Sequence, residues 1–301
     1  MHDEPDAVGE PTEDLAANTR LALVESSKLC RARPGEDTCD WYHGFYPLLR
    51  AVGAAAAPDR HARFYARELG RLARMGGFDR VLIPGAADSG MLQCLLSVYR
   101  SAGVPARIRV LDRCETPLLV CRSFADCCRV TIETLRCDLL APDMPSQPDP
   151  GFDLACTHSL LAFFPPAQRR TGIEACGRWL RTGGRLVSTA RIDPITSETG
   201  SRFTPDAARA FAARVRELAA SSGAAAGLAP ATVFERALRY AECMLSWPYA
   251  SAQHLVADLE AGGFAVEQLG IVEVPGRLAP GAAGAGTSQS ATYAEFVASR
   301  I

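Results

Sequence analysis

Side chains that could do chemistry follow four apolar stretches that the sequence predicts to be strands. One stretch ends in a turn of small residues, two end in aspartates, and the last ends in a threonine and a histidine. In order they are 80–83 before Gly85, 107–111 before Asp112, 130–136 before Asp138, and 152–156 before Thr157 and His158. Because ligands bind at the carboxyl ends of the strands in a doubly wound sheet, we expect one site there.

The turn after the first strand and Asp112 have the residue types of a nucleotide-binding unit. Small residues let the backbone approach a ligand, and the helix predicted at 89–99 offers free N–H groups at its start. A carboxylate about twenty residues later, at the tip of the next strand, can accept both hydroxyls of a ribose. Both features also have a structural interpretation, as an ordinary strand–helix turn and as a cap for the helix 116–128.

The elements that must position these residues alternate between strand and helix. Helices are predicted at 58–75, 89–99, 117–128 and 166–180, and a turn at 180–184 precedes a fifth strand at 185–189. A helix capped by Thr204 should extend to residue 220, and another should cover 231–245. The helix 250–261 and the strands 264–274 and 292–298 complete an α/β sheet. Loops are expected at 139–151 and 279–290, and a loose arm at 1–11, before a helix from Thr12 to Cys30.

Five segments occur in a recognisable order and spacing. They are VLIPGAADSG, VLDRC, RCDLLAP, FDLACTHSLLAFFP and WLRTGGRLVSTAR, and AGGFAVEQLG with TYAEFVASR continues the pattern to the end of the sequence. This set resembles the class I S-adenosylmethionine-dependent methyltransferases. Ile83 stands where that family has an acidic residue, and Ala87 and Ser89 stand where its turn has glycines.

The resemblance implies a doubly wound, Rossmann-like fold with a seven-stranded, mostly parallel sheet, and S-adenosylmethionine as the cofactor. Asp112 would take the ribose hydroxyls, Asp138 would accept from the adenine amino group, and Asp88 would either reach the methionine end or cap the first helix. The implied cofactor-binding residues are Gly85, Ala86, Asp88, Asp112, Arg113, Asp138, Leu139 and Thr157.

His158 is the candidate general base for an acceptor that arrives protonated. It follows the fourth strand, where this family brings methyl donor and acceptor together, and an imidazole can titrate near neutral pH. The alternative is a hydrogen-bonded structural histidine. Arg191, after the fifth strand, would hold a substrate carboxylate or only cap the sheet edge.

The segment 40–53 is rich in aromatic residues with polar tips. Tyr42 and His43 are second candidates for catalysis and Tyr46 for substrate binding, if the segment forms a lid; otherwise its aromatic side chains are core. We expect a helical N-terminal lid over residues 1–75 and a methyltransferase domain over 76–301. A helical cap insertion at 193–249 would enclose a small substrate.

Composition limits the partners. The net charge of −2 favours neither nucleic acid nor an anionic membrane, and no apolar run is long enough to span a bilayer. The 11 cysteines include no CxxC pair and no Cys/His group at zinc spacing, so we expect free thiols, no metal and a cytoplasmic protein without a signal peptide. Both monomer and homodimer remain open.

The leading hypothesis is therefore a methyltransferase of small-molecule biosynthesis. One alternative is an enzyme that cyclises S-adenosylmethionine to azetidine-2-carboxylate, and another is a non-catalytic binding protein with this fold; Ile83 and Ala87 keep both open. A nicotinamide reductase fits less well, because the sequence has neither G-x-G-x-x-G nor Tyr-x-x-x-Lys. The methyl acceptor is not specified by the sequence.

Overall fold

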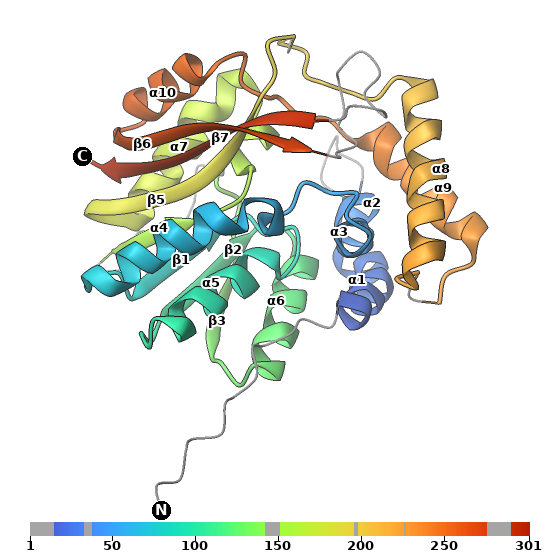
Figure 1. The fold of residues 1–301 in the computed structure, drawn as a ribbon, viewed down its shortest axis with the longest axis horizontal. Coiled ribbons are helices and arrows are strands. Elements are labelled where there is room, and N and C mark those ends of the chain that lie inside the picture. The colour runs from blue at the N-terminus through green and yellow to red at the C-terminus, as the bar shows by residue number, and fades with distance from the viewer. Residues whose placement is uncertain (1–14, 33–37, 142–150, 196–197, 226, 276–289) are drawn as a thin grey trace, which may run out of the picture.

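The computed structural model describes residues 15–32, 38–141, 151–195, 198–225, 227–275 and 290–301. Its centre is a seven-stranded sheet in the order β3-β2-β1-β4-β5-β7-β6 (Figure 1). The neighbours from β3 to β5 pair in parallel, whereas β7 is antiparallel to both β5 and β6. The strands are β1 (Arg80–Pro84), β2 (Arg107–Asp112), β3 (Ile132–Arg136), β4 (Phe152–Cys156), β5 (Leu180–Ile192), β6 (Phe264–Pro275) and β7 (Ser290–Arg300). The predicted doubly wound, mostly parallel sheet is confirmed.

Helices cover both faces of the sheet and extend beyond its edge. They are α1 (Leu15–Leu29), α2 (Asp40–His43), α3 (Tyr46–Ala51), η1 (Pro58–His61), α4 (Ala62–Met75), α5 (Gly90–Ser101), α6 (Glu115–Cys127), η2 (Leu160–Phe163), α7 (Pro166–Trp179), α8 (Pro205–Ser222), α9 (Pro230–Cys243) and α10 (Ala252–Ala261). None of the helices in the described part of the chain has the length and hydropathy that a membrane span requires.

The two faces of the sheet form separate parts of the core because strand side chains alternate in direction. In β1, Val81 and Ile83 pack into the cluster formed with α4, α5 and α6. Leu82, between them, belongs to the cluster on the other side, formed with α7 and α10. The apolar run in β1 therefore serves both faces, as in a parallel strand buried on each side.

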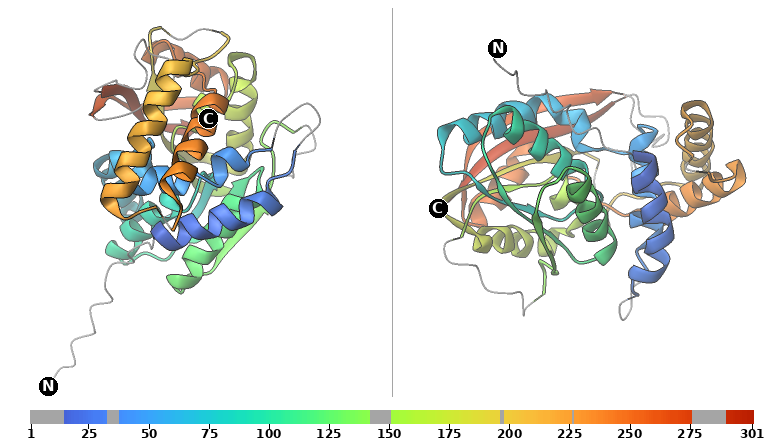
Figure 2. Two further views of the ribbon diagram at one scale, coloured as in Figure 1. Left: turned by 90° about the vertical axis from the view of Figure 1, so that its right-hand side faces the viewer. Right: turned by 90° about the horizontal axis from the view of Figure 1, so that it is seen from below.

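A third apolar cluster lies beyond the sheet and joins the N-terminal helices to α8 and α9 (Figures 1 and 2). Phe45 and Leu49 from the N-terminal segment pack there with Phe211 of α8 and Val233 of α9. The predicted cap of α8 is present, since the Thr204 hydroxyl accepts a hydrogen bond from the Ala207 N–H at 3.3 Å. The N-terminal helices thus share one core with α8 and α9.

Several predicted boundaries differ from the structure. β5 begins at Leu180 rather than residue 185, because 181–184 form an irregularity within the strand where its register to β4 shifts. The predicted helix 58–75 is divided into η1 and α4. Thr12 and the arm 1–11 lie outside the described residues, as do most of the predicted loops 139–151 and 279–290.

Candidate functional site

Two adjoining cavities lie at the carboxyl edge of the sheet. The larger, of about 680 Å³, follows the strand ends from Asp138 past Asp112 to Gly85, and we call it the edge cavity. The smaller, of about 130 Å³, lies between the turn after β1 and the helical cap, where Tyr240 and other aromatic residues line it, and we call it the cap cavity. The residues that line both define the junction: Tyr42, Gly85, Ala86, Ala87, His158 and Phe163.

The turn after β1 has a backbone that suits glycine at Gly85. Its φ of 70° is in the left-handed region, and a Cβ there would lie 2.6 Å from Cδ1 of Leu160. The Gly85 N–H donates to the Leu111 carbonyl at 2.8 Å, and the Ala86 N–H donates to Oδ2 of Asp112 at 3.0 Å. The turn is therefore fixed against the end of β2.

Asp112 is buried beneath this turn and lines the edge cavity. Its Oδ1 accepts the Cys114 N–H at 2.7 Å, and each carboxylate oxygen has lone pairs for more than one donor. Burial raises the pKa of Asp112, while His43 and the backbone N–H groups of Cys114 and Ala86 oppose that shift. The carboxylate can hold its backbone donors and still face a ligand.

The other predicted adenosine contacts share the same cavity. Arg113, Asp138 and Leu139 all line it. Oδ1 of Asp138 accepts the Leu140 N–H at 3.0 Å, which fixes the turn after β3. The structure thus brings the predicted residues at the ends of β2 and β3 together along one surface.

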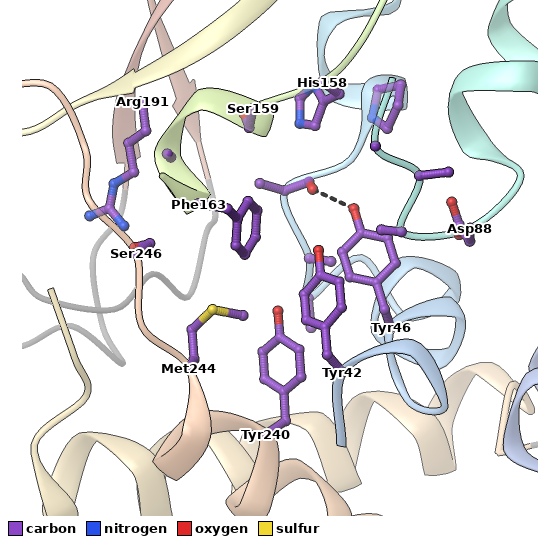
Figure 3. Close-up of a pocket in the computed structure, with 18 of the residues that line it drawn as sticks. Tyr42, Tyr46, Asp88, His158, Ser159, Phe163, Arg191, Tyr240, Met244 and Ser246 are labelled. Carbon is purple, nitrogen blue, oxygen red and sulfur yellow. Dashed lines mark hydrogen bonds between the residues drawn. The ribbon is translucent and has the colours of Figure 1, made fainter. Parts of the chain in front are cut away.

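Asp88 binds the start of α5 and also lines a cavity. Its Oδ1 accepts the Gly90 N–H at 2.8 Å at the start of α5, and the residue also lines the cap cavity (Figure 3). Its Oδ2 lies 3.4 Å from Nη1 of the buried Arg50, which also pairs with Asp59. Sequence reasoning missed this ion pair, because Arg50 is one arginine among many and sits 38 residues away.

Thr157 lines neither cavity. Its hydroxyl donates to the Pro84 carbonyl at 2.8 Å, and its N–H donates to the Val187 carbonyl at 3.2 Å. The residue therefore connects the end of β4 to the ends of β1 and β5. The structure therefore does not place Thr157 with the other predicted cofactor-binding residues that line the cavities.

His158 lies at the junction. Nδ1 is 3.0 Å from Oγ1 of Thr189 and 3.3 Å from the Tyr65 hydroxyl oxygen, whose proton goes to the Thr157 carbonyl at 2.8 Å. Tyr65 has no second proton to give to Nδ1, whereas the Thr189 hydroxyl can donate to Nδ1 or accept from it, so the donor at Thr189 decides which ring nitrogen carries the proton. Nε2 is buried and makes no hydrogen bond within the described chain.

The surroundings keep the His158 ring neutral. Burial lowers its pKa well below the usual value, and the neighbouring His61 lowers it further, while the Ala56 carbonyl acts in the opposite direction. The ring centroids of His61 and His158 are 5.3 Å apart, and Nδ1 of His61 is 2.9 Å from Oε1 of Glu295. Sequence reasoning missed both His61 and Glu295. The only signal that could have found them is that both side chains are titratable.

Aromatic side chains from α2, α3, η2 and α9 form the wall of the cap cavity (Figure 3). Tyr42 stacks on Tyr240 of α9 with ring centroids 5.9 Å apart, and its edge meets Phe163 of η2. The Tyr46 hydroxyl donates to the Ala56 carbonyl at 2.7 Å. Burial raises the pKa of all three tyrosines, so they are protonated phenols at neutral pH.

Arg191 reaches the cap cavity from the end of β5. Its Nη2 donates to Oδ2 of Asp193 at 3.1 Å, so the guanidinium is already paired with a carboxylate. Arg191 therefore lines the cap cavity, but the Asp193 carboxylate would compete with a substrate for its guanidinium.

His43 lies away from the cap cavity, in the wall of the edge cavity. It is buried beside the buried Cys30 and Cys114 and the half-buried Cys39. Burial acts to lower its pKa, but the Cys114 and Cys39 thiols and the charge of Asp112 raise it to about 10. Of the three predicted catalytic residues, the structure brings His158 and Tyr42 to the junction and does not bring His43 there.

Comparisons with known proteins agree with this geometry at the level of the fold. No protein-family model and no curated protein matches the sequence. Among solved structures, the [4+2]-cyclase SpnF has a TM-score of 0.52 and 15% identity over 86% of this chain and 93% of its own. Magnesium protoporphyrin IX methyltransferase from Synechocystis PCC 6803, solved with S-adenosylhomocysteine, has a TM-score of 0.50 and 11% identity over 87% of this chain and 97% of its own.

A S-adenosylmethionine-dependent methyltransferase from Methanosarcina mazei is also similar, with a TM-score of 0.49 and 14% identity over 77% of this chain and 97% of its own. The neighbours with a TM-score of 0.50 or more, the SpnF cyclase and the magnesium protoporphyrin IX methyltransferase, have the fold of class I S-adenosylmethionine-dependent methyltransferases. This chain has that fold. At such low identity the likeness concerns architecture, and SpnF is named for a reaction other than methyl transfer.

Proposed function

We propose that the protein is a S-adenosylmethionine-dependent methyltransferase acting on a small molecule. The observation that carries the proposal is the junction, where the edge cavity meets the cap cavity beside His158. A donor held along the strand ends and an acceptor held under the cap would meet there. The neighbours with this fold include methyltransferases, which is consistent with the proposal.

The edge cavity suits an adenosine cofactor. Its volume of about 680 Å³ is in the range of small-molecule sites. We assign the ribose hydroxyls to Asp112, the adenine to Asp138 and Leu139, and the sulfur end to the turn at Gly85, where the absence of a Cβ leaves room for Leu160. When bound, S-adenosylmethionine supplies a methyl group on a positively charged sulfur.

The methionine end needs a partner other than Ile83, which carries no charge. We assign its ammonium group to Asp88, which lines the cap cavity beside the turn and is held in place by Arg50. A carboxylate fixed by an arginine and a backbone N–H retains lone pairs for another donor. In this proposal Asp88 compensates for the departure from the family pattern.

His158 would accept the proton of the acceptor group at Nε2. Nδ1 lies within hydrogen-bond distance of the hydroxyl oxygens of Thr189 and Tyr65, which fixes the orientation of the ring. Because methyl transfer from a sulfonium depends mainly on proximity and orientation, the aromatic wall would position the acceptor and exclude water. Tyr42 and Tyr46 would contact an acceptor that is small and largely apolar or aromatic, and we assign residues 1–75 the role of a lid.

Calorimetry tests the cofactor first. Titration with S-adenosylmethionine, S-adenosylhomocysteine and NADPH should show binding of the first two and none of NADPH; no binding of either sulfur compound would refute the proposal.

Mass spectrometry of the products formed from S-adenosylmethionine alone distinguishes cyclisation of the cofactor from methyl transfer. Formation of azetidine-2-carboxylate at a rate that His158→Ala abolishes would favour cofactor cyclisation over methyl transfer, with His254→Ala on the exposed face of α10 as the matched control.

A further inference from the structure

Three cysteines and one histidine from separate elements meet beside the edge cavity. Cys30 follows α1, Cys39 precedes α2, His43 ends α2, and Cys114 precedes α6. One ligand atom from each, the sulfurs and a ring nitrogen, lies within 4.8 Å of all the others. Cys39 and His43 are four residues apart, which places them on one side of a helical turn.

The spacing of these atoms suits a tetrahedral metal ion. A zinc–sulfur bond of about 2.3 Å implies sulfurs about 3.8 Å apart in a tetrahedron. The Cys30 and Cys114 sulfurs are 3.5 Å apart, and no pair in the group exceeds 4.8 Å. Three thiolates and an imidazole form a donor set that selects zinc over magnesium or calcium.

The surroundings independently point to a bound cation. His43 is 6% exposed, and its Nδ1 makes no hydrogen bond within the described chain, although buried polar atoms are normally satisfied. The hydroxyl of the buried Thr116 is 3.3 Å from the Cys30 sulfur and can donate to it, as groups around metal-bound thiolates do.

We propose that Cys30, Cys39, His43 and Cys114 bind one Zn²⁺ ion. All four positions are filled by protein ligands, so the site is closed and structural rather than catalytic. It would join α1 and α2 to the start of α6, and α1 already packs against α6 (Figure 1).

The zinc ion would also stabilise the edge cavity. The Cys114 N–H donates to Oδ1 of Asp112 at 2.7 Å, and Cys39, His43 and Asp112 line the same cavity. Fixing Cys114 therefore fixes one of the two backbone donors that orient the Asp112 carboxylate. The proposal does not depend on methyl transfer, because metal content can be measured in a protein with no known activity.

Metal analysis of the full chain, purified under reducing conditions with zinc in the medium and no chelator, tests the site. We expect about one zinc per chain in the wild type and in Cys127→Ser, which removes an exposed cysteine of α6 outside the group. Cys114→Ser and Cys39→Ser should each retain less than about a tenth of that zinc. Replacement by Co²⁺ should give the visible spectrum of a tetrahedral cobalt thiolate site, and that spectrum should be absent in both variants.

A second measurement covers the case in which the variants do not fold. Removing the metal from the wild type with a chelator should lower its unfolding temperature, and Zn²⁺ but not Mg²⁺ should restore it. A wild type without zinc that keeps its unfolding temperature in chelator would overturn the proposal. So would a Cys30–Cys114 disulfide in the purified protein, or zinc that Cys114→Ser and Cys39→Ser retain in full.

Discussion

The regions around His158 and His43 start from the same residue type and reach opposite electrostatic states. His158 sits at a strand end among hydroxyl groups and beside a second histidine, and its pKa is lowered by burial. His43 is buried whereas His158 is half-buried, and around His43 sulfur atoms and the Asp112 carboxylate raise the pKa, so a metal ion would bind there by displacing the ring proton. The neighbouring groups, together with burial, therefore decide what each imidazole can do.

The two regions also differ in how their parts are supplied. The His158 region is built on the sheet edge, where residues that follow strands meet by topology. The His43 region is assembled from the ends of α1, α2 and α6, which meet only because the N-terminal helices pack on the sheet domain. Asp112 belongs to both regions, since it accepts from Ala86 at the junction and from Cys114 in the cysteine group.

The largest expected effect separates the two histidines. His158→Ala should reduce turnover by about 10²–10⁴-fold, the usual contribution of a general base, with cofactor affinity nearly unchanged. His43→Ala should instead lose zinc and stability. Turnover measured at saturating S-adenosylmethionine, together with calorimetry, checks both expectations.

The pH profile gives a sharper test of the same pair. Because the pKa of His158 is well below 6.5, the acid limb of kcat should lie below pH 6.5, lower than the near-neutral limb that the sequence alone suggests. That limb should be absent in His158→Ala and kept in His254→Ala. Normal turnover in His158→Ala would return the residue to a structural role, and loss of cofactor binding would place it in the cofactor pocket.

Asp112 belongs to both regions. The Asp112→Ala substitution should weaken S-adenosylhomocysteine binding. Loss of a charge-assisted bond to the ribose costs roughly 1.5–3 kcal/mol, equivalent to about ten- to a hundred-fold in Kd. Calorimetry measures the change, and thermal unfolding shows whether the variant remains folded without its bonds to Ala86 and Cys114. A folded variant with an unchanged Kd would disprove the ribose assignment.

Gly85→Ala should destabilise the junction without touching the cysteine group. The left-handed backbone costs an alanine roughly 1–2 kcal/mol, and its Cβ would meet Leu160. Leu160→Ala should relieve the contact but not the backbone strain. Gly85→Ala should therefore cost less stability in the Leu160→Ala background than in the wild type, but it should still cost some. Denaturant unfolding measures each step; full recovery would mean that the backbone there adapts to a side chain.

The sequence predicted what depends on local pattern. Each strand end that carries Gly85, Asp112, Asp138 or His158 follows a short apolar run bounded by small or polar residues, and these positions converge as expected. The departures lie where local pattern is ambiguous. Thr157 has the right place in the chain, but it points behind the sheet edge, and β5 continues through a stretch with two glycines.

The partners across elements could not be predicted from one sequence. Arg50 with Asp88, and His61 with Glu295, are separated by 38 and 234 residues, and no spacing rule connects them. The cysteine group was missed because its ligands do not form a CxxC pair and its fourth member is 71 residues after His43. Only Cys39 and His43, four apart, gave a local indication.

The smallest effect is on stability at acidic pH, and it concerns His158 and His61. Burial lowers the pKa of both rings in the folded chain below the ordinary value of 6.5. Below pH 6.5 the unfolded chain therefore binds more protons at these positions than the folded chain, so the free energy of unfolding falls as the pH falls. The slope cannot exceed about 1.4 kcal/mol per pH unit for each ring, and it vanishes above the unfolded pKa.

Chemical denaturation of wild type, His158→Gln and His254→Gln between pH 7.5 and 5 isolates the contribution of His158 to this pH dependence. The other titrating groups are common to all three proteins, so their contributions cancel when the free energies of unfolding are subtracted. His158→Gln should lose stability less steeply than the wild type while His254→Gln follows the wild type, and parallel curves for all three would show that His158 is not held neutral by its surroundings.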